Sequence, residues 1–294
     1  MEVAGQVLSY PGLIALGVIV GLVAGMFGVG GGFLLTPLLS VVFGVPMPIA
    51  VGTGLCQMVG SSTSAALRHR KMGQGEPRFA IVMIVGSLAG VSAGARAIAE
   101  LNESLPSGRG QIDVTAVLYG AYVFFLLCIA GVLWWQGRGG FEDLEYVRRG
   151  PLSRWRLPPY IDLLSIPMPQ VSVMGIAYLG LFLGFLSGFL GTSGGIALIP
   201  ILLYGYGFPF RQAAGTGIVV TWLTAVVGTL AHYADGNVHV GLAMVLMVGS
   251  SLSAQVGAEL TRSVSATRLR KGLAAIVFTM ALVIVGELVN RLQG

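Results

Sequence analysis

The sequence contains a glycine-rich interruption of a hydrophobic segment, and the same interruption occurs a second time. Residues 25–37 read GMFGVGGGFLLTP, and residues 188–200 read GFLGTSGGIALIP, at a constant offset of 163 residues. Without a gap, the offset also relates His69 to His232. Self-similarity at one fixed offset indicates an internal duplication, so the chain is expected to fold as two related halves.

The composition indicates an integral membrane protein. Hydrophobic residues make up 55% of the 294 residues and charged residues 10%, which is far more apolar than a soluble core of this length requires. The net charge of +5 does not indicate nucleic acid, because the basic residues fall in the predicted loops. Cys56 and Cys128 both lie in apolar runs, which argues against a disulfide scaffold.

Each interruption is expected to divide one membrane segment into two half-helices. The first apolar segment, residues 12–27, ends before the roughly 20 residues that a bilayer core requires. It meets the sequence Gly28-Val29-Gly30-Gly31-Gly32, and each helical glycine costs about 1 kcal/mol relative to alanine. Non-helical backbone at membrane depth is tolerated only inside protein or along a cavity. We therefore expect unwound backbone inside the protein at each interruption.

The remaining apolar runs complete five segments in each half. In the first half they are residues 12–27 and 33–43 on either side of the break, then 49–67, 79–99 and 114–135. In the second half they are residues 173–190 and 196–204 on either side of the break, then 213–231, 240–260 and 273–289. The predicted fold is an all-α integral membrane protein of about 5+5 transmembrane segments, or 8 to 10 crossings. The predicted domains are a first repeat at residues 1–136, a cytoplasmic linker at 137–170 and a second repeat at 171–294.

An odd number of segments in each half places the two repeats in opposite orientations. The positive-inside rule supports this inverted topology, because it puts most of the 17 Lys and Arg residues on the side of the loop that follows Arg68-His69-Arg70-Lys71. Both termini are then expected outside. In inverted repeats, matching interrupted segments mark a transport site near the membrane midplane, so the half-helices are expected to meet there.

The interruptions predict an anion site built without charged side chains. A helix N-terminus carries about half a positive charge and free N–H groups, which together bind anions. No charged residue lies within residues 12–67, and Arg211 is the only one within residues 171–231. The candidate substrate-binding residues are the glycines and neutral donors Gly28, Gly30, Gly31, Gly32, Thr53, Gln57, Ser61, Gly191, Thr192, Ser193, Gly194, Gly195, Thr216 and Thr221. No catalytic residue, metal or cofactor is expected.

The doubled motif resembles the TauE/SafE sulfite exporter family over nearly the whole chain. The patterns that carry the resemblance are GxxxGxxGxGGG…P and GxxxGxxGTSGG…P, each followed by GTG. The resemblance implies a secondary transporter that moves sulfur-containing anions, such as sulfite or organosulfonates, across the bacterial inner membrane. It carries over to residues 28–32, 52–54, 191–195 and 215–217, and it implies no role for the long linker.

Electrostatics favours export of such an anion. Each elementary charge that crosses 100 mV is worth about 2.3 kcal/mol, so a divalent anion leaves a negative-inside cell downhill without a coupling ion. The expected partners are a small anionic substrate and membrane lipid, with a homodimer as a possible assembly and no nucleic acid.

Two other functions are compatible with the same residues. A passive anion channel would use the same arrangement of donors. An intramembrane serine protease would use Ser193 in the string Gly191-Thr192-Ser193-Gly194, with His232 or His239 as the base. The position that matches Ser193 in the first half is Gly30, which argues against a nucleophile motif.

Overall fold

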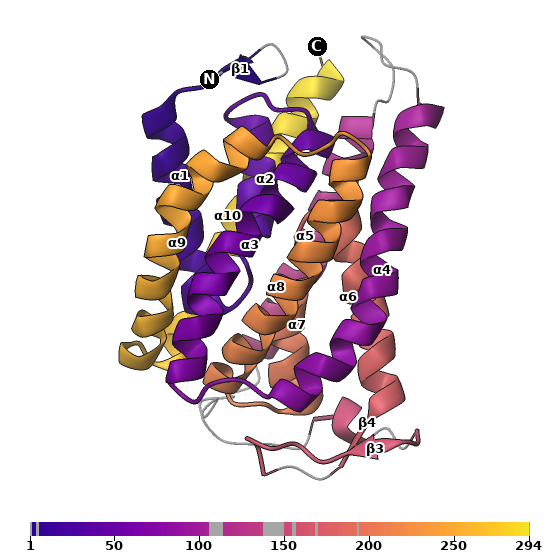
Figure 1. The fold of residues 1–294 in the computed structure, drawn as a ribbon, viewed down its shortest axis with the longest axis vertical. Helices are drawn as coiled ribbons and strands as arrows, with labels where there is room; N and C mark the ends of the chain where they lie inside the picture. The colour runs from indigo at the N-terminus through magenta and orange to yellow at the C-terminus, as the bar shows by residue number, and fades with distance from the viewer. Residues whose placement is uncertain are drawn as a thin grey trace.

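The protein is a bundle of long helices that lie side by side (Figure 1). This computed structural model describes residues 2–3, 6–105, 114–137, 150–154, 157–167, 170–192 and 194–293. The first half contains α1 (Tyr10–Phe27), α2 (Gly32–Val41), α3 (Met47–Lys71), α4 (Pro77–Ser104) and α5 (Val114–Gly137). The second half contains α6 (Val173–Leu190), α7 (Gly195–Pro200), the π-helix η2 (Ile201–Tyr206), α8 (Phe210–Ala234), α9 (Val240–Ser263) and α10 (Ala266–Gln293).

The other described elements are short. Strand β1 (Glu2–Val3) pairs antiparallel with β2 (Gln6–Val7) before α1. The 3₁₀ helix η1 (Leu152–Arg154) and strand β3 (Tyr160–Ile161) lie between the halves, and β3 pairs antiparallel with β4 (Val171–Ser172). The apolar segments expected from the sequence are thus all helical, and each interrupted segment is divided at its glycines as predicted, into α1 and α2 in the first half and into α6 and the stretch of α7 and η2 in the second.

Membrane insertion is supported by the length and surface of the helices. Within the described part of the chain, seven helices are long and apolar enough to cross a membrane: α1, α4, α5, α6, α8, α9 and α10. The outward faces carry exposed apolar side chains, such as Val85, Phe124 and Leu252. Helix α3 lies among these helices but is not one of the seven, because its polar run from Ser61 to Ser64 lowers its hydropathy.

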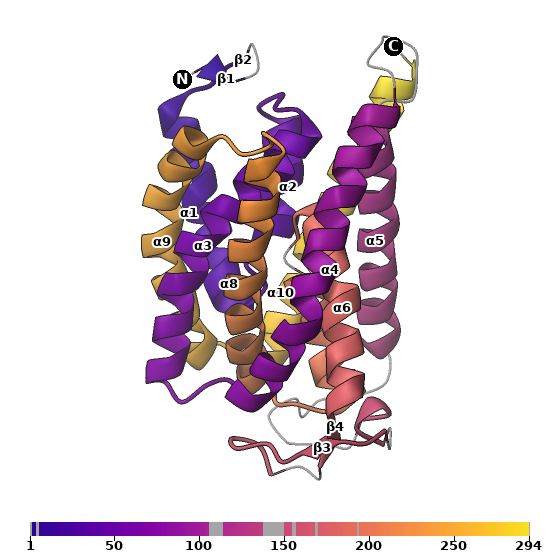
Figure 2. The same ribbon diagram turned by 45° about the vertical axis from the view of Figure 1, so that its right-hand side comes forward.

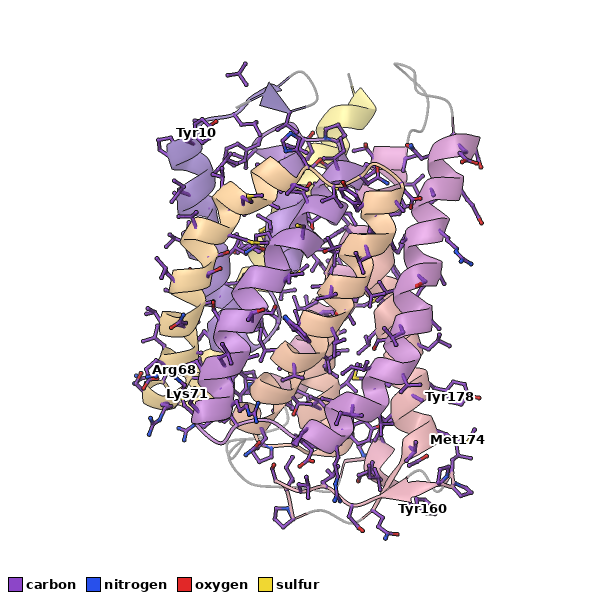
Figure 3. All side chains as sticks on the ribbon, viewed as in Figure 1. Tyr10, Arg68, Lys71, Tyr160, Met174 and Tyr178 are labelled. Atoms are coloured by element: carbon purple, nitrogen blue, oxygen red, sulfur yellow. The ribbon has the colours of Figure 1, made fainter. Side chains whose placement is uncertain are left out.

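The matching helices α1 and α6 run in opposite directions through the bundle. Helix α1 begins, at Tyr10, at the same end of the bundle where α10 finishes, which we call the terminal end (Figures 1 and 3). Helix α3 finishes at the other end with Arg68 and Lys71, and we call this the basic end (Figure 3). Helix α6, the counterpart of α1, begins at the basic end, where Met174 and Tyr178 lie (Figure 3).

The first helix of each half packs along the fourth helix of the other half. Helix α1 lies along α9 and α6 lies along α4, as Figure 2 also shows. A Cβ atom built on Gly25 would lie 1.9 Å from the carbonyl oxygen of Ala254, and one on Gly188 would lie 2.2 Å from that of Val91. Glycine therefore permits backbone contact here, which is typical of small residues spaced four apart on membrane helices. The other contacts of this kind join Gly17 to Leu246, Gly21 to Ser250, Gly180 to Met83 and Gly184 to Ser87.

The described part of the linker is fastened to the basic end. The Gly150 amide donates to the carbonyl oxygen of Tyr206 at 3.3 Å. The Ser165 amide donates to the Glu76 carboxylate at 2.5 Å, and Glu76 is buried. The linker thus contacts the start of α4 and the end of η2, which belong to different halves.

Candidate functional site

The first break consists of residues 28–32, between α1 and α2. Helix α1 ends at Phe27, and Gly28, Gly30 and Gly31 have φ angles of +70°, +76° and +76°. These angles lie in the left-handed region that glycine adopts without a steric penalty. Helix α2 then begins at Gly32, and the whole break is buried. The glycines therefore end one helix and start another, as the sequence predicted.

The second break consists of residues 191–195, between α6 and α7. Gly191 and Gly194 have φ angles of +66° and +64°, which match those of Gly28 and Gly31. Thr192 is fully buried, and its hydroxyl accepts a 3.3 Å hydrogen bond from the Gly194 amide. Ser193, a candidate of the sequence analysis, lies outside the described residues. The backbone turn is thus repeated, whereas the side chains between the glycines are not.

The two breaks contact each other inside the bundle. A Cβ atom built on Gly32 would lie 2.2 Å from the carbonyl oxygen of Gly191. One built on Gly195 would lie 2.7 Å from the carbonyl oxygen of Val29. The hydroxyl of Thr36 donates a long hydrogen bond of 3.5 Å to the Gly191 carbonyl. Backbone of one half therefore packs directly on backbone of the other.

Each break leaves amide groups without an acceptor. Among the described residues, none accepts a hydrogen bond from the N–H groups of Gly32 and Phe33, or from those of Gly195 and Ile196. These are the first amides of the helical stretches Gly32–Val41 and Gly195–Tyr206. The first amides of a helix have no intrahelical partner and carry partial positive charge. The contact between the breaks therefore collects hydrogen-bond donors in a region without charged side chains.

Tyr122 reaches the first break from α5. Its hydroxyl donates to the carbonyl oxygen of Gly32 at 3.2 Å, and its side chain is fully buried. The residue at the matching position of α10 is Val285, which cannot make this bond. Tyr122 is not recognisable as a site residue from the sequence, because one tyrosine in a long apolar run does not indicate its hydrogen-bond partner.

Two histidines hold the ends of the helices that precede the breaks. The Nε2 atom of His69 lies 2.9 Å from the carbonyl oxygen of Gly25, and that of His232 lies 2.8 Å from the carbonyl of Gly188. A carbonyl only accepts, so each Nε2 carries the proton. The last carbonyls of a helix lack intrahelical partners, and the two imidazole N–H groups are the donors for these two carbonyls. Both side chains are buried in protein.

Thr53 closes a contact at the terminal end. Its hydroxyl oxygen accepts a 3.0 Å hydrogen bond from the amide of His239, the residue that precedes α9. A Cβ atom built on the adjacent Gly52 would lie 2.4 Å from the carbonyl oxygen of Asn237. We call Gly52, Thr53 and the loop residues Gly236, Asn237 and His239 between α8 and α9 the terminal-end clasp. It fastens α3 of the first half to the α8–α9 loop of the second.

Thr216 closes the equivalent contact at the basic end. Its hydroxyl oxygen accepts a 2.9 Å hydrogen bond from the amide of Glu76, the residue that precedes α4. A Cβ atom built on Gly215 would lie 2.7 Å from the carbonyl oxygen of Gln74. We call Gly215, Thr216 and the loop residues Gln74 and Glu76 the basic-end clasp. The GTG motifs therefore each seat a loop of the opposite half, and two predicted site residues have a defined structural contact.

The basic-end clasp has additional bonds. The Gln212 side chain accepts from the Gly75 amide at 2.7 Å and donates to the Gly73 carbonyl at 3.3 Å. The matching residue of the first half is Ile49, which has no polar side-chain atoms. The loop at the basic end is therefore held by more hydrogen bonds than the loop at the terminal end.

The other predicted site residues lie on α3 and α8, and their role as ligands stays a prediction. The Gln57 amide nitrogen donates to the Ser250 hydroxyl on α9 at 2.5 Å. Ser61 donates to the Met58 carbonyl of its own helix at 3.4 Å. Thr221 is fully buried on α8. Helix α3 does border the first break through Met58, whose terminal carbon would lie 2.7 Å from a Cβ atom on Gly32.

The candidate bases of a serine protease have other contacts. The imidazole of His232 is bonded to the Gly188 carbonyl, and the Nδ1 atom of His239 accepts from the Leu242 amide at 3.1 Å. Within the described residues, no three His, Cys, Asp or Glu side chains form a group that could hold a metal ion. The arrangement is that of a site built from neutral donors.

Comparison with known proteins gives one consistent result. The sequence profile described as "Sulfite exporter TauE/SafE" matches residues 13–284. A probable membrane transporter protein of Methanocaldococcus jannaschii is 26% identical over 291 residues, covering 94% of this chain and 95% of that protein. The probable membrane transporter protein YunE of Bacillus subtilis is 23% identical over 289 residues, covering 95% and 96%. No solved structure gives a significant match.

Proposed function

Because the chain belongs to the TauE/SafE sulfite exporter family, we propose that it exports a small sulfur-containing anion, sulfite or an organosulfonate, across the bacterial inner membrane. Membrane transport itself follows from the family, from the transporter relatives and from the apolar helices. The observation that carries the proposed site is the contact of Gly32 with Gly191, which brings the free amides of both breaks together.

The two halves form an inverted-topology repeat in this proposal. Three independent contacts recur at the offset of 163 residues: histidine to carbonyl, threonine to loop amide, and glycine to backbone. The opposite directions of α1 and α6 in Figure 1 support the inversion. Inverted repeats are the usual architecture of transporters that expose one site to alternate sides.

The clasps are the gates of this transporter. The terminal-end clasp contains Thr53, the basic-end clasp contains Thr216, and the two lie at opposite ends of the bundle. Both are formed in this structure. Release of one clasp would free a loop at one end while the other end stays closed, as alternating access requires.

The anion and its direction follow from charge. Free N–H groups and hydroxyls donate to any small oxyanion, and the break regions hold no acidic side chain to repel it. A cytoplasmic basic end, with Arg68 and Lys71, satisfies the positive-inside rule and leaves both termini outside. The membrane potential then drives anions outward without a coupling ion.

The direct test is flux of isotopically labelled sulfite from proteoliposomes under a clamped potential. We expect flux to rise with the potential and to continue without a pH gradient. Gly32→Ala is expected to abolish it, because the new Cβ would lie 2.2 Å from the Gly191 carbonyl oxygen. Gly120→Ala is the matched control, since a Cβ there has no neighbour within 4 Å.

The other outcomes separate the alternatives. A carrier accelerates labelled efflux when unlabelled sulfite is present on the far side, whereas a passive channel does not. Flux that requires a pH gradient would contradict uncoupled export. Flux of a sulfonate in place of sulfite would decide between the two proposed substrates, and flux of thiosulfate alone would keep the site and change the substrate. A folded protein that moves no anion would contradict the proposal.

A further inference from the structure

Ser187 has a buried hydroxyl group that makes no hydrogen bond. It lies in the last turn of α6 before the second break, its residue is 0% exposed, and its Oγ atom has no partner among the described residues. Burying a hydroxyl without a partner is costly. Serine in a helix ordinarily bonds back to its own backbone, as Ser87 does to Met83 and Ser253 does to Gly249.

The face of α6 that carries Ser187 is turned toward the second break. Leu183 lies one turn earlier on the same face, and its carbonyl oxygen would be 2.7 Å from a Cβ atom built on Gly194. In the first half, the residue at the matching position is Ala24, whose Cβ would lie 3.3 Å from a Cβ built on Gly31. By this correspondence, Ser187 lies on the face of α6 that meets the second break.

We propose that the Ser187 hydroxyl donates a hydrogen bond to an oxygen atom of the transported anion at the second break. This inference rests on the proposed function and assigns it a specificity-determining side chain. The ligand class is a small oxyanion, since a hydroxyl donor held among apolar residues and free amides needs an acceptor of high charge density. Bonds between a neutral donor and an ionised acceptor are stronger than bonds between neutral groups.

The assignment makes the site asymmetric. At the first break, Ala24 offers no donor, so the backbone amides of Gly32 and Phe33 act without a side chain from α1. At the second break, α6 contributes an O–H group as well. The anion is therefore held nearer to the second break than to the first.

Ser187→Ala tests the assignment with little risk to folding, because alanine already occupies the matching position as Ala24. We expect the Kd for sulfite, measured by isothermal titration on purified protein, to rise about tenfold, the size expected for losing one bond to an anion. The thermal midpoint without sulfite is expected to stay level or rise, because an unpaired hydroxyl is removed. Ser187→Thr keeps a hydroxyl and is expected to restore most of the affinity.

Ser87→Ala is the matched control, because it removes a buried serine hydroxyl that is bonded to its own helix. It is expected to leave the Kd for sulfite unchanged. An unchanged Kd in Ser187→Ala, with wild-type protein binding sulfite, would overturn this inference and leave the proposed function intact. Wild-type protein that neither binds nor transports any tested oxyanion would instead contradict the proposed function.

Discussion

The two breaks have matching backbone angles at two pairs of glycines and differ in their side chains. Gly28 and Gly191 have φ angles within a few degrees of each other, and so do Gly31 and Gly194. Around this common turn, Ala24 in the first half is replaced by Ser187 in the second. The repeated features are those that the packing of the halves requires, whereas the differences include Ala24 and Ser187 near the breaks and Ile49 and Gln212 at the clasps. The duplication thus maintains the fold, and in our proposal the difference between Ala24 and Ser187 adapts the site to its ligand.

The largest expected effect is a loss of stability, and it is measured by comparing Gly32→Ala with Gly195→Ala. The new Cβ would lie 2.2 Å from an oxygen of the other break in the first variant and 2.7 Å in the second. We expect Gly32→Ala to destabilise the protein by about 2 to 3 kcal/mol and Gly195→Ala by less, since overpacking scales with overlap. Thermal unfolding in detergent measures this order. Equal midpoints for the two variants would show that the breaks do not press on each other.

The next comparison uses the paired histidines. His69→Leu and His232→Leu keep much of the side-chain volume but leave the carbonyls of Gly25 and Gly188 without their donors. Each variant is expected to lose about 1 to 3 kcal/mol of stability, the cost of an unpaired buried group. Chemical unfolding measures the loss. A large loss in one variant with none in the other would mean that the two histidines do not have the same role.

The clasps are expected to respond unequally. Thr53→Val and Thr216→Val each remove an acceptor for one loop amide, which is worth about 1 kcal/mol. At the basic end, the Gln212 side chain makes two further hydrogen bonds to the loop. The residue that matches Gln212 in the first half, Ile49, cannot make such bonds to residues 236–239. Hydrogen exchange of residues 236–239 in Thr53→Val is therefore expected to rise more than that of residues 73–76 in Thr216→Val. The reverse order would contradict the stronger fastening of the basic end.

The smallest expected effect concerns the linker. Glu76→Gln replaces the buried carboxylate that accepts from the Ser165 amide with a neutral amide, which weakens the bond by about 1 kcal/mol. Exchange of residues 163–167 is expected to rise, while the clasps keep their protection. His239, at the matching position in the other half, has no linker to hold, so His239→Gln is expected to leave residues 163–167 unchanged.

Much of the helix layout could be predicted from the sequence, because glycine acts locally. Runs of glycine cannot continue a helix, so the ends of α1 and α6 at Phe27 and Leu190 follow from the residues that come next. Glycines spaced by four residues, as at Gly17, Gly21 and Gly25, are typical of close helix contact. The partner helix did not follow, because the stripe at Gly17 and Gly25 fits any helix of small residues, and the structure pairs it with α9 of the other half.

The side-chain contacts were less accessible to sequence reasoning. Thr53 and Thr216 were predicted to bind substrate, and the structure bonds each to an amide of the opposite half. Such contacts depend on how two distant loops meet. The offset that relates His69 to His232 was visible, and it was the one signal that could have indicated their common role. Nothing in the sequence indicates Ser187, because its hydroxyl differs from other serine hydroxyls only in having no hydrogen-bond partner among the described residues.

The central claim is that the amides of the two breaks bind the transported anion. Hydrogen–deuterium exchange of the purified protein, with and without sulfite, tests this claim most directly. We predict that peptides covering residues 28–33 and 191–196 gain protection when sulfite is added, because Gly32, Phe33, Gly195 and Ile196 hold the free amides. If the protein transports sulfite while both peptides exchange at unchanged rates, the anion binds elsewhere and the claim is wrong.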